Sequence, residues 1–219
     1  MAASDAGVSP LDPDLSEEAA LHEGGLRLVA GVDEAGRGAW AGPLVAAAVI
    51  LPEPHSVPDD FLVGVRDSKL CSPELRETLF DAVVGAARAV GVGSVAADEI
   101  DLLGLTAANE LAMVRAVRSL HPSPDFVLVD CFTLRSLGTP QRGIVQGDRR
   151  CLSIAAASIV AKVYRDAWLA DLAEPHPAYG FERHRGYGVR DHRKAIGANG
   201  VTPLHRLSYA PLRAITKRP

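Results

Sequence analysis

The sequence predicts an α/β protein with one mixed, five-stranded sheet flanked by helices, followed by a helical C-terminal extension. Short apolar runs of strand length alternate along the chain with longer segments of helical periodicity. The run Leu44–Leu51 is uninterrupted and rich in Val, Ala and Ile, as is typical of a strand buried on both faces. Pro and Gly punctuate the C-terminal part, which therefore holds only short helical segments.

The elements can be placed in order along the chain. Leu26–Asp33 and Leu44–Leu51 are the first two strands, with Gly42-Pro43 as the turn into the second. A helix begins at Ser72-Pro73, where Ser is the N-cap and Pro the first helical residue, and extends to about Val90. The remaining expected elements are a strand at Val90–Ile100, a helix at Thr106–Leu120, strands at Phe126–Asp130 and Gly143–Gln146, a long helix at Leu152–Ala173 and a final helix at about Asp191–Ile196.

Three parts of the chain are distinguished by composition. Residues 1–25 form a flexible N-terminal segment in which Ser16 caps a short helix to about His22. Residues 26–175 form the α/β domain, and residues 176–219 form its helical C-terminal extension. No internal repeat or low-complexity tract interrupts this organisation.

Composition excludes several classes of protein. No apolar run reaches the ~18 residues that span a membrane, and the first residues lack the basic and apolar parts of a secretory signal. Cys71, Cys131 and Cys151 lack the CxxC spacing of a zinc cluster. We therefore expect three buried, inert thiols in a cytoplasmic protein.

Charge is distributed unevenly. The net charge of −4 does not by itself indicate a nucleic-acid binder, yet Lys and Arg outnumber Asp and Glu from Arg149 to the end. Such asymmetry favours a polyanionic partner for the basic part. A solvated basic surface, reflecting a compositional bias towards arginine, is the alternative.

The segment Gly31–Gly38, GVDEAGRG, carries the strongest chemical signal. Asp33 and Glu34 stand where an apolar strand runs out, and buried carboxylates are costly to ionise without a cation beside them. Gly36-Arg37-Gly38 follows, and glycines around an arginine let backbone amides approach a polyanion. A polar strand end with a Gly-rich turn is the alternative. Adjacent strand residues point to opposite faces, so a shared site requires the strand to end or bend here.

Two further acids follow predicted strands. Asp130 ends the strand Phe126–Asp130, and Asp148 lies just after the last short strand, although it could equally occupy a surface turn. Strand ends collect at one edge of an α/β sheet, so these acids are expected to meet Asp33 and Glu34. Converging carboxylates need divalent cations, and oxygen ligands suit Mg²⁺ or Mn²⁺. Two such ions can promote phosphodiester hydrolysis.

Several basic and polar residues are candidate phosphate contacts. Ser158 and Lys162 share one face of the long helix with Asp166, although a solvated face with a local Lys–Asp pair is the alternative. Lys69 could contact phosphate or belong to a helix-capping segment. His184 and Arg185 are expected to line the substrate groove, although an isolated histidine is more often structural.

From about Leu28 to Pro211 the chain resembles bacterial ribonuclease HII. The resemblance is carried by the ordered blocks GVDEAGRG, AGPLVAAAVIL, DSKL, FVLVD, QGD, SIAAASIVAKVYRD, YGFERHRGYG and TPLHRLSYAP. It implies the ribonuclease H-like fold in a monomer. It also implies cleavage on the 5′ side of ribonucleotides, in RNA–DNA hybrids or in duplex DNA, with 3′-hydroxyl and 5′-phosphate products and a role in ribonucleotide removal during replication and repair.

The resemblance also implies residue roles. Asp33, Glu34, Asp130 and Asp148 match the four metal-site acids, which serve Mn²⁺ or Mg²⁺, two ions per site. Gly36-Arg37-Gly38 matches the loop that reads the ribose 2′-hydroxyl, a group that DNA lacks. Tyr187 matches the aromatic that packs on the following deoxyribose. The chain departs from the pattern where Cys131 and Phe132 replace the usual glycine after Asp130, and where Val189 replaces a common threonine.

Other interpretations remain at this stage. A non-catalytic hybrid-binding protein of the same fold would bind without nicking, and the four acids argue against it. The sister type of ribonuclease H has a separate N-terminal domain, for which the roughly 25 residues before the first strand are too few. A sliding clamp is a possible partner, but the tail Thr216-Lys217-Arg218-Pro219 has no clear motif for it.

Overall fold

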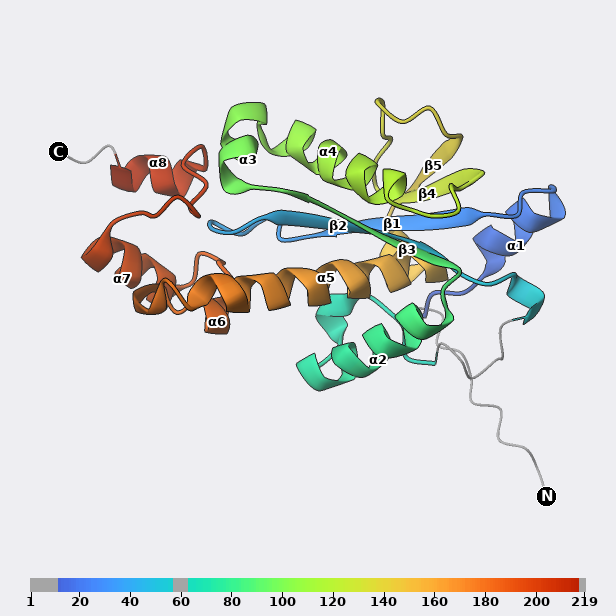
Figure 1. Ribbon diagram of the computed structural model, residues 1–219, viewed down its shortest axis with the longest axis horizontal. Helices are drawn as coiled ribbons and strands as arrows, with labels where there is room; N and C mark the ends of the chain where they lie inside the picture. The colour runs from blue at the N-terminus through green and yellow to red at the C-terminus, as the bar shows by residue number, and fades with distance from the viewer. Residues whose placement is uncertain (1–11, 57–62, 217–219) are drawn as a thin grey trace, which may run out of the picture.

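The computed structural model describes residues 12–56 and 63–216. The predictions for residues 1–11 and for the last three residues lie outside this range. A five-stranded sheet forms the middle layer, with α3 (Ala97–Leu103) and α4 (Leu105–Arg118) on one face, and α2 (Pro73–Ala86) and α5 (Leu152–Ala173) on the other (Figure 1).

The sheet is mixed, as predicted. Its strands are β1 (Val29–Ala35), β2 (Leu44–Ile50), β3 (Ala89–Val95), β4 (Phe126–Asp130) and β5 (Gln141–Ile144), in the order β3-β2-β1-β4-β5. The pairs β1–β2 and β2–β3 are antiparallel, and the pairs β1–β4 and β4–β5 are parallel. All residues of β2 are buried, which confirms the interpretation of its continuous apolar run.

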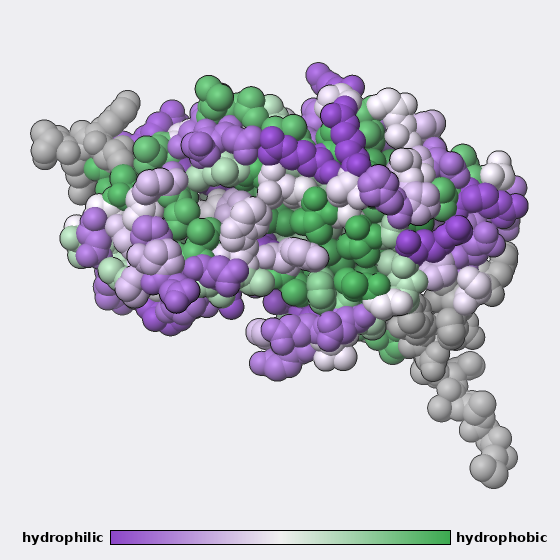
Figure 2. Space-filling model, in the orientation of Figure 1, coloured by the Kyte–Doolittle hydropathy of each residue, from purple (hydrophilic) through white to green (hydrophobic). Residues whose placement is uncertain are grey.

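The pleat of β1 assigns its residues to two cores. Ala30 and Val32 pack with α4, whereas Ala35 belongs to the core formed with α5. At Gly31 an added Cβ would lie 2.2 Å from the backbone of Ser153, so glycine lets α5 approach the strand closely. Apolar side chains accordingly gather over the middle of the molecule, while the outer surfaces of α2 and α4 are largely hydrophilic (Figure 2).

The long helix α5 begins and ends where the sequence predicts. Its first turn is held by α1 (Ser16–Glu23), where the buried Glu18 carboxylate accepts from the backbone N–H of Ser153 at 2.8 Å. Ser72 caps α2 as predicted, since its hydroxyl accepts from the N–H of Leu75 at 3.2 Å. Ser16, by contrast, lies inside α1 and does not cap it.

Three other predictions need correction. The strand expected over Val90–Ile100 stops at Val95, because Glu99 accepts from the backbone N–H of Ala96 at 3.1 Å and helps to start α3. The last strand lies at Gln141–Ile144, slightly earlier than expected. The C-terminal extension contains η4 (Pro177–Tyr179), α6 (Phe181–His184), α7 (Arg190–Asn199) and α8 (Ala210–Thr216), of which only α7 was expected. No helix in the described part of the chain is long and apolar enough to span a membrane.

Candidate active site

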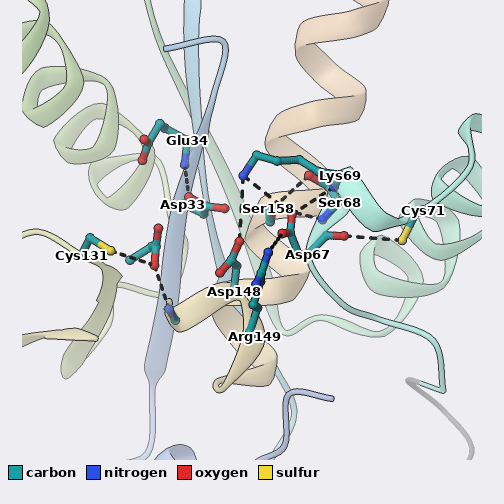
Figure 3. Close-up of polar contacts among 12 residues, drawn as sticks. Asp33, Glu34, Asp67, Ser68, Lys69, Cys71, Cys131, Asp148, Arg149 and Ser158 are labelled. Atoms are coloured by element: carbon teal, nitrogen blue, oxygen red, sulfur yellow. Dashed lines mark hydrogen bonds and ion pairs between the residues drawn. The ribbon is translucent and has the colours of Figure 1, made fainter. Parts of the chain in front are cut away.

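Asp33 and Asp130 lie side by side on two paired strands. Val32 of β1 pairs with Val129 of β4, so the next residue on each strand is one of these aspartates. The pleat turns both away from α4, and Ser158 of α5 lies beside Asp33 (Figure 3). The structure therefore brings these two aspartates together, although only Asp130 stands at the end of its strand.

Glu34 points to the other face of the sheet. β1 does not end at Asp33 but pairs with β2 through Ala35, so the expected strand end is wrong by two residues. The two carboxylates consequently diverge in Figure 3, although the N–H of Glu34 donates to Asp33 Oδ1 at 2.7 Å. Glu34 Oε1 lies 3.7 Å from the Arg37 guanidinium, and its other oxygen is buried without a hydrogen-bond partner.

Asp148 reaches the site from a turn. After β5 the backbone enters the left-handed region at Gln146, and Asp148 sits in the short helix η3 (Gly147–Arg149) rather than at a strand end. The preceding Gly147 N–H donates to Asp130 Oδ1 at 2.8 Å, which ties this turn to β4. Asp148 is only 7% exposed, so the alternative of an exposed surface turn is wrong.

The electrostatics of these acids favour cations. Burial, then the neighbouring charges of Glu34 and Asp130, raise the pKa of Asp33 well above its ordinary value. Burial likewise raises the pKa of Glu34 and, together with Asp67 and Asp130, that of Asp148. Ionised together, these groups repel one another, so a bound cation would stabilise them.

The donor set fits a hard divalent cation. All four candidate ligands are carboxylates, and Glu34 keeps one oxygen without a partner. In the parts of the chain that the structure describes, however, no three His, Cys, Asp or Glu side chains form a group that could hold a metal ion as they lie. Asp33, Asp130 and Asp148 therefore lie near one another, with Glu34 on the opposite face of β1, and the four do not form a ready coordination sphere.

Lys69 and Asp67 complete this region, as Figure 3 shows. Lys69, in the short helix η2 (Ser68–Leu70), places its Nζ 4.0 Å from Asp148 and 3.7 Å from Asp67. Burial lowers the pKa of Lys69, but Asp67, Asp33 and Asp148 outweigh burial and raise it. Asp67 is almost fully buried and also lies 3.3 Å from Arg149 Nη2. Sequence reasoning missed Asp67, although it stands in the DSKL block.

The residues directly after the loop Gly36-Arg37-Gly38 lie against Gly186 and Tyr187. Ala39 bridges to Tyr187, and the N–H of Trp40 donates to the carbonyl of Gly186 at 2.8 Å. An added Cβ on Gly188 would lie 2.1 Å from the Trp40 ring, so this contact needs glycine. Two segments far apart in sequence thus form one surface.

Two fully buried arginines hold this surface from below, and sequence reasoning missed both roles. Arg206 Nη1 donates to the carbonyl of Gly36 at 2.7 Å, and its other nitrogens donate to the carbonyl of Gly42. Arg165 donates to the carbonyls of Pro43 and Ala41, and its guanidinium lies 5.4 Å from the centre of the Tyr187 ring. Burial lowers the pKa of Arg165 to about 10, so it remains charged at neutral pH. The backbone carbonyls that both arginines bind come together only in the folded chain, and these hydrogen bonds explain why two cations are buried here.

The other predicted contacts are distributed along α5 and α6. Ser158 is buried and its hydroxyl lies 2.9 Å from that of Ser68. Lys162, one turn further, donates to Asp166 at 2.7 Å. Both ring nitrogens of His184 contact backbone atoms, those of Tyr179 and Gly186. A substrate contact by His184 remains a prediction.

Cys131 corrects one expectation. Cys71 and Cys151 are buried free thiols, but Cys131 is exposed. It follows Asp130 in the left-handed backbone region, at φ +57°, and its thiol lies 3.5 Å from Asp130 Oδ1. Cys131 thus adopts the left-handed backbone conformation for which glycine, the usual residue at this position, is best suited.

A mixed sheet in which aspartates of two adjacent parallel strands lie side by side, next to a glycine loop, defines a nuclease of the ribonuclease H-like class. The family model of ribonuclease HII matches residues 30–212, and the chain belongs to the ribonuclease HII family. It is 48% identical to ribonuclease HII of Geobacillus kaustophilus over 91% of this chain and 75% of that one. It is 45% identical to that of Dehalococcoides mccartyi, covering 93% and 95% of the two chains.

The solved structures agree. The fold matches the crystal structure of ribonuclease H2 from Pyrococcus horikoshii with a TM-score of 0.71 and 28% identity, over 87% of this chain and 97% of that one. The expected ribonuclease H-like fold is therefore confirmed. This chain is a ribonuclease H endonuclease.

Proposed function

We propose that the chain hydrolyses the phosphodiester on the 5′ side of a ribonucleotide, in RNA–DNA hybrids and in duplex DNA with embedded ribonucleotides. Water adds to phosphorus and the bond from phosphorus to the preceding O3′ breaks, which leaves a 3′-hydroxyl and a 5′-phosphate. The observation that carries this proposal is that Asp33 and Asp130 lie beside one another on β1 and β4, near the end of β1 from which the loop Gly36-Arg37-Gly38 emerges.

The carboxylates of Asp33, Glu34, Asp130 and Asp148 are the proposed ligands of Mn²⁺ or Mg²⁺, with two ions per site. Bound there, the ions would activate water and neutralise charge on the phosphate and the leaving oxygen. The raised pKa of Asp33 and the unpartnered oxygen of Glu34 support this assignment. Lys69, whose Nζ lies 3.7 Å from Asp67 and 4.0 Å from Asp148, is the proposed partner of a phosphate oxygen.

Selection of the ribose is assigned to the loop and the C-terminal extension. The backbone of Gly36-Arg37-Gly38 can donate to and accept from a 2′-hydroxyl, and Tyr187 offers an aromatic face to the neighbouring sugar. Arg165 and Arg206 fix the backbone beneath the loop and beneath Tyr187. The loop and the Tyr187 ring are therefore already in position before the substrate binds. Residues 176–219 therefore act as a substrate-contacting extension of the catalytic domain.

The test uses a labelled DNA duplex with one ribonucleotide, beside the same duplex with a 2′-deoxynucleotide at that position. With Mn²⁺ or Mg²⁺ we expect one nick 5′ to the ribonucleotide, a 3′ end that a polymerase extends, and no nick in EDTA or in the all-DNA duplex. Cleavage on the 3′ side, cyclic phosphate ends or metal-independent cutting would contradict the proposal. Tight binding without nicking would favour the hybrid-binding alternative.

A further inference from the structure

A cluster of three cations around one carboxylate lies beyond the acids, between α2, α5 and α6. Asp166 of α5 accepts a hydrogen bond from Lys162 Nζ at 2.7 Å. Its Oδ2 lies 3.9 Å from Arg76 Nη1 and 3.9 Å from Arg185 Nε. The three cations come from separate elements, so the fold rather than local sequence assembles this cation cluster.

The two guanidiniums of the cluster are not saturated by Asp166. Arg76 donates from Nε to the carbonyl of Ser68 at 3.0 Å and from Nη2 to that of Cys71 at 2.8 Å, which leaves its Nη1 facing Asp166. A separation of 3.9 Å exceeds the 2.7–3.2 Å of a direct hydrogen bond. Arg185 Nη1 is buried and makes no hydrogen bond. One carboxylate faces three positive charges, and the exposed Glu77 is the other acid that lines the adjoining cavity of about 230 Å³. The cluster therefore keeps unused positive charge and donor capacity.

The cluster is aligned with the active site. Ser158, Lys162 and Asp166 recur every four residues on α5, which places the cluster roughly 12 Å from Ser158 along the helix. Ser158 lies beside Asp33, and Lys162 Nζ lies 5.9 Å from the centre of the Tyr187 ring. Phosphates of one strand follow at about 3.4 Å along the duplex axis, so a strand in the site would reach the cluster within a few nucleotides.

We propose that Arg76, Lys162 and Arg185 form a binding site for the phosphodiester backbone of the substrate duplex, several nucleotides from the cleaved bond. Asp166 occupies the place of the phosphate in the free protein and keeps the cations together. This inference rests on the proposed function, since it takes the nucleic acid to lie across the acids and Tyr187. The site reads backbone charge and is indifferent to sugar type.

The test measures binding in EDTA, where no cleavage is expected, to fluorescent duplexes with and without one ribonucleotide, across a series of salt concentrations. Arg76→Gln is expected to weaken binding of both duplexes equally and to reduce the salt slope of log Kd by about one. Arg88→Gln is the matched control. Arg88 pairs with Glu53 and its N–H donates to the carbonyl of Ile50, the last residue of β2, so it lies at the end of the sheet away from the acids. This variant should leave the slope unchanged.

The Asp166→Asn variant distinguishes a phosphate-binding cluster from an ion-pair cluster that only stabilises the fold. If Asp166 substitutes for phosphate, its neutralisation should tighten binding and steepen the salt slope. Glu77→Gln is the control, because it adds the same charge at the cavity rim without releasing the cations. Weaker binding by Asp166→Asn, or an unchanged slope in a folded Arg76→Gln, would overturn the proposal. Binding needs no metal or turnover, so these results stand apart from failure of the nicking assay. If Arg76→Gln does not fold, Asp166→Asn decides alone.

Discussion

Arg165 lies directly under Gly36, the first glycine of the loop that follows β1. Gly36 has φ +90°, and a Cβ added there would fall 1.8 Å from Arg165 Nε. The Arg165 guanidinium donates to backbone carbonyls on both sides of residue 42, so it cannot move away without losing those hydrogen bonds. The glycine and the buried arginine therefore require each other.

This relationship predicts a specific cost for Gly36→Ala. A methyl group must displace a buried cation and occupy a left-handed conformation, so we expect a loss of about 2 kcal/mol or more in the free energy of unfolding. Gly38→Ala is the matched control for stability, because a Cβ there meets nothing within 4 Å. Urea unfolding checks both variants. Equal stability of the two would show that the close contact at Gly36 is unimportant.

Asp33 should oppose folding in the absence of metal. Its pKa is raised in the folded protein, chiefly by burial, so the stability that it contributes is present below its ordinary pKa of 3.8 and is lost as the pH rises through the folded value. At pH 7 in EDTA, Asp33→Asn is therefore expected to raise Tm. Added Mn²⁺ should raise the Tm of the wild type more than that of the variant.

Thermal melts with and without Mn²⁺ check this prediction, with Asp98→Asn on the outer side of α3 as a control for loss of one negative charge. A lower Tm for Asp33→Asn in EDTA would contradict it. So would an equal shift on adding Mn²⁺ to both proteins, because that would place the ion elsewhere.

His192 should make stability depend on pH in mildly acidic solution. Its Nδ1–H donates to the carbonyl of Tyr187 at 3.0 Å, and its Nε2 lies 3.1 Å from Nε2 of His205. Because His205 Nδ1 accepts from the N–H of Thr202, the His205 Nε2–H must donate to His192. A proton on His192 Nε2 would break this chain, which fixes the backbone of Tyr187.

Burial lowers the pKa of His192 from 6.5 to about 4. The unfolded chain therefore binds one more proton between these values, so this stability is present above pH 6.5 and is lost as the pH falls through about 4, by up to about 1.4 kcal/mol per pH unit. In His192→Asn the amide can still donate to Tyr187, and this part of the pH dependence should vanish. Urea unfolding from pH 7 to 4 checks it, and identical pH profiles would refute it.

Much of the fold was predictable because local signals agreed with burial. The continuous apolar run of β2 and the Ser72-Pro73 start of α2 determine those elements almost alone. Val90–Ile100 was extended too far because Ala96 and Ala97 continue the apolar pattern of β3, and the hydrogen bond from Ala96 to Glu99 depends on a turn that periodicity does not reveal.

The sequence indicated the four acids, whose role as metal ligands stays a prediction, and did not indicate the residues that support them. Asp130 ends β4 and Asp33 lies two residues before the end of β1, and the parallel pairing of these strands brings the two together. Asp148 depends on the left-handed turn at Gln146, which no local pattern announces. Arginine is usually a surface residue, so the sequence does not indicate that Arg165 and Arg206 are buried. Their burial is explained by hydrogen bonds to backbone carbonyls that only the folded loop brings within reach.

The most direct test of the account compares wild type with Asp130→Asn on the duplex that contains one ribonucleotide, in single-turnover reactions with Mn²⁺. Asp130 also accepts from Gly147, so circular dichroism and binding in EDTA must first show that the variant is folded and binds. We expect the wild type to nick 5′ to the ribonucleotide and the variant to lose at least about 100-fold in rate, because one carboxylate ligand is removed. A wild-type rate in the folded variant would show that the reaction occurs elsewhere.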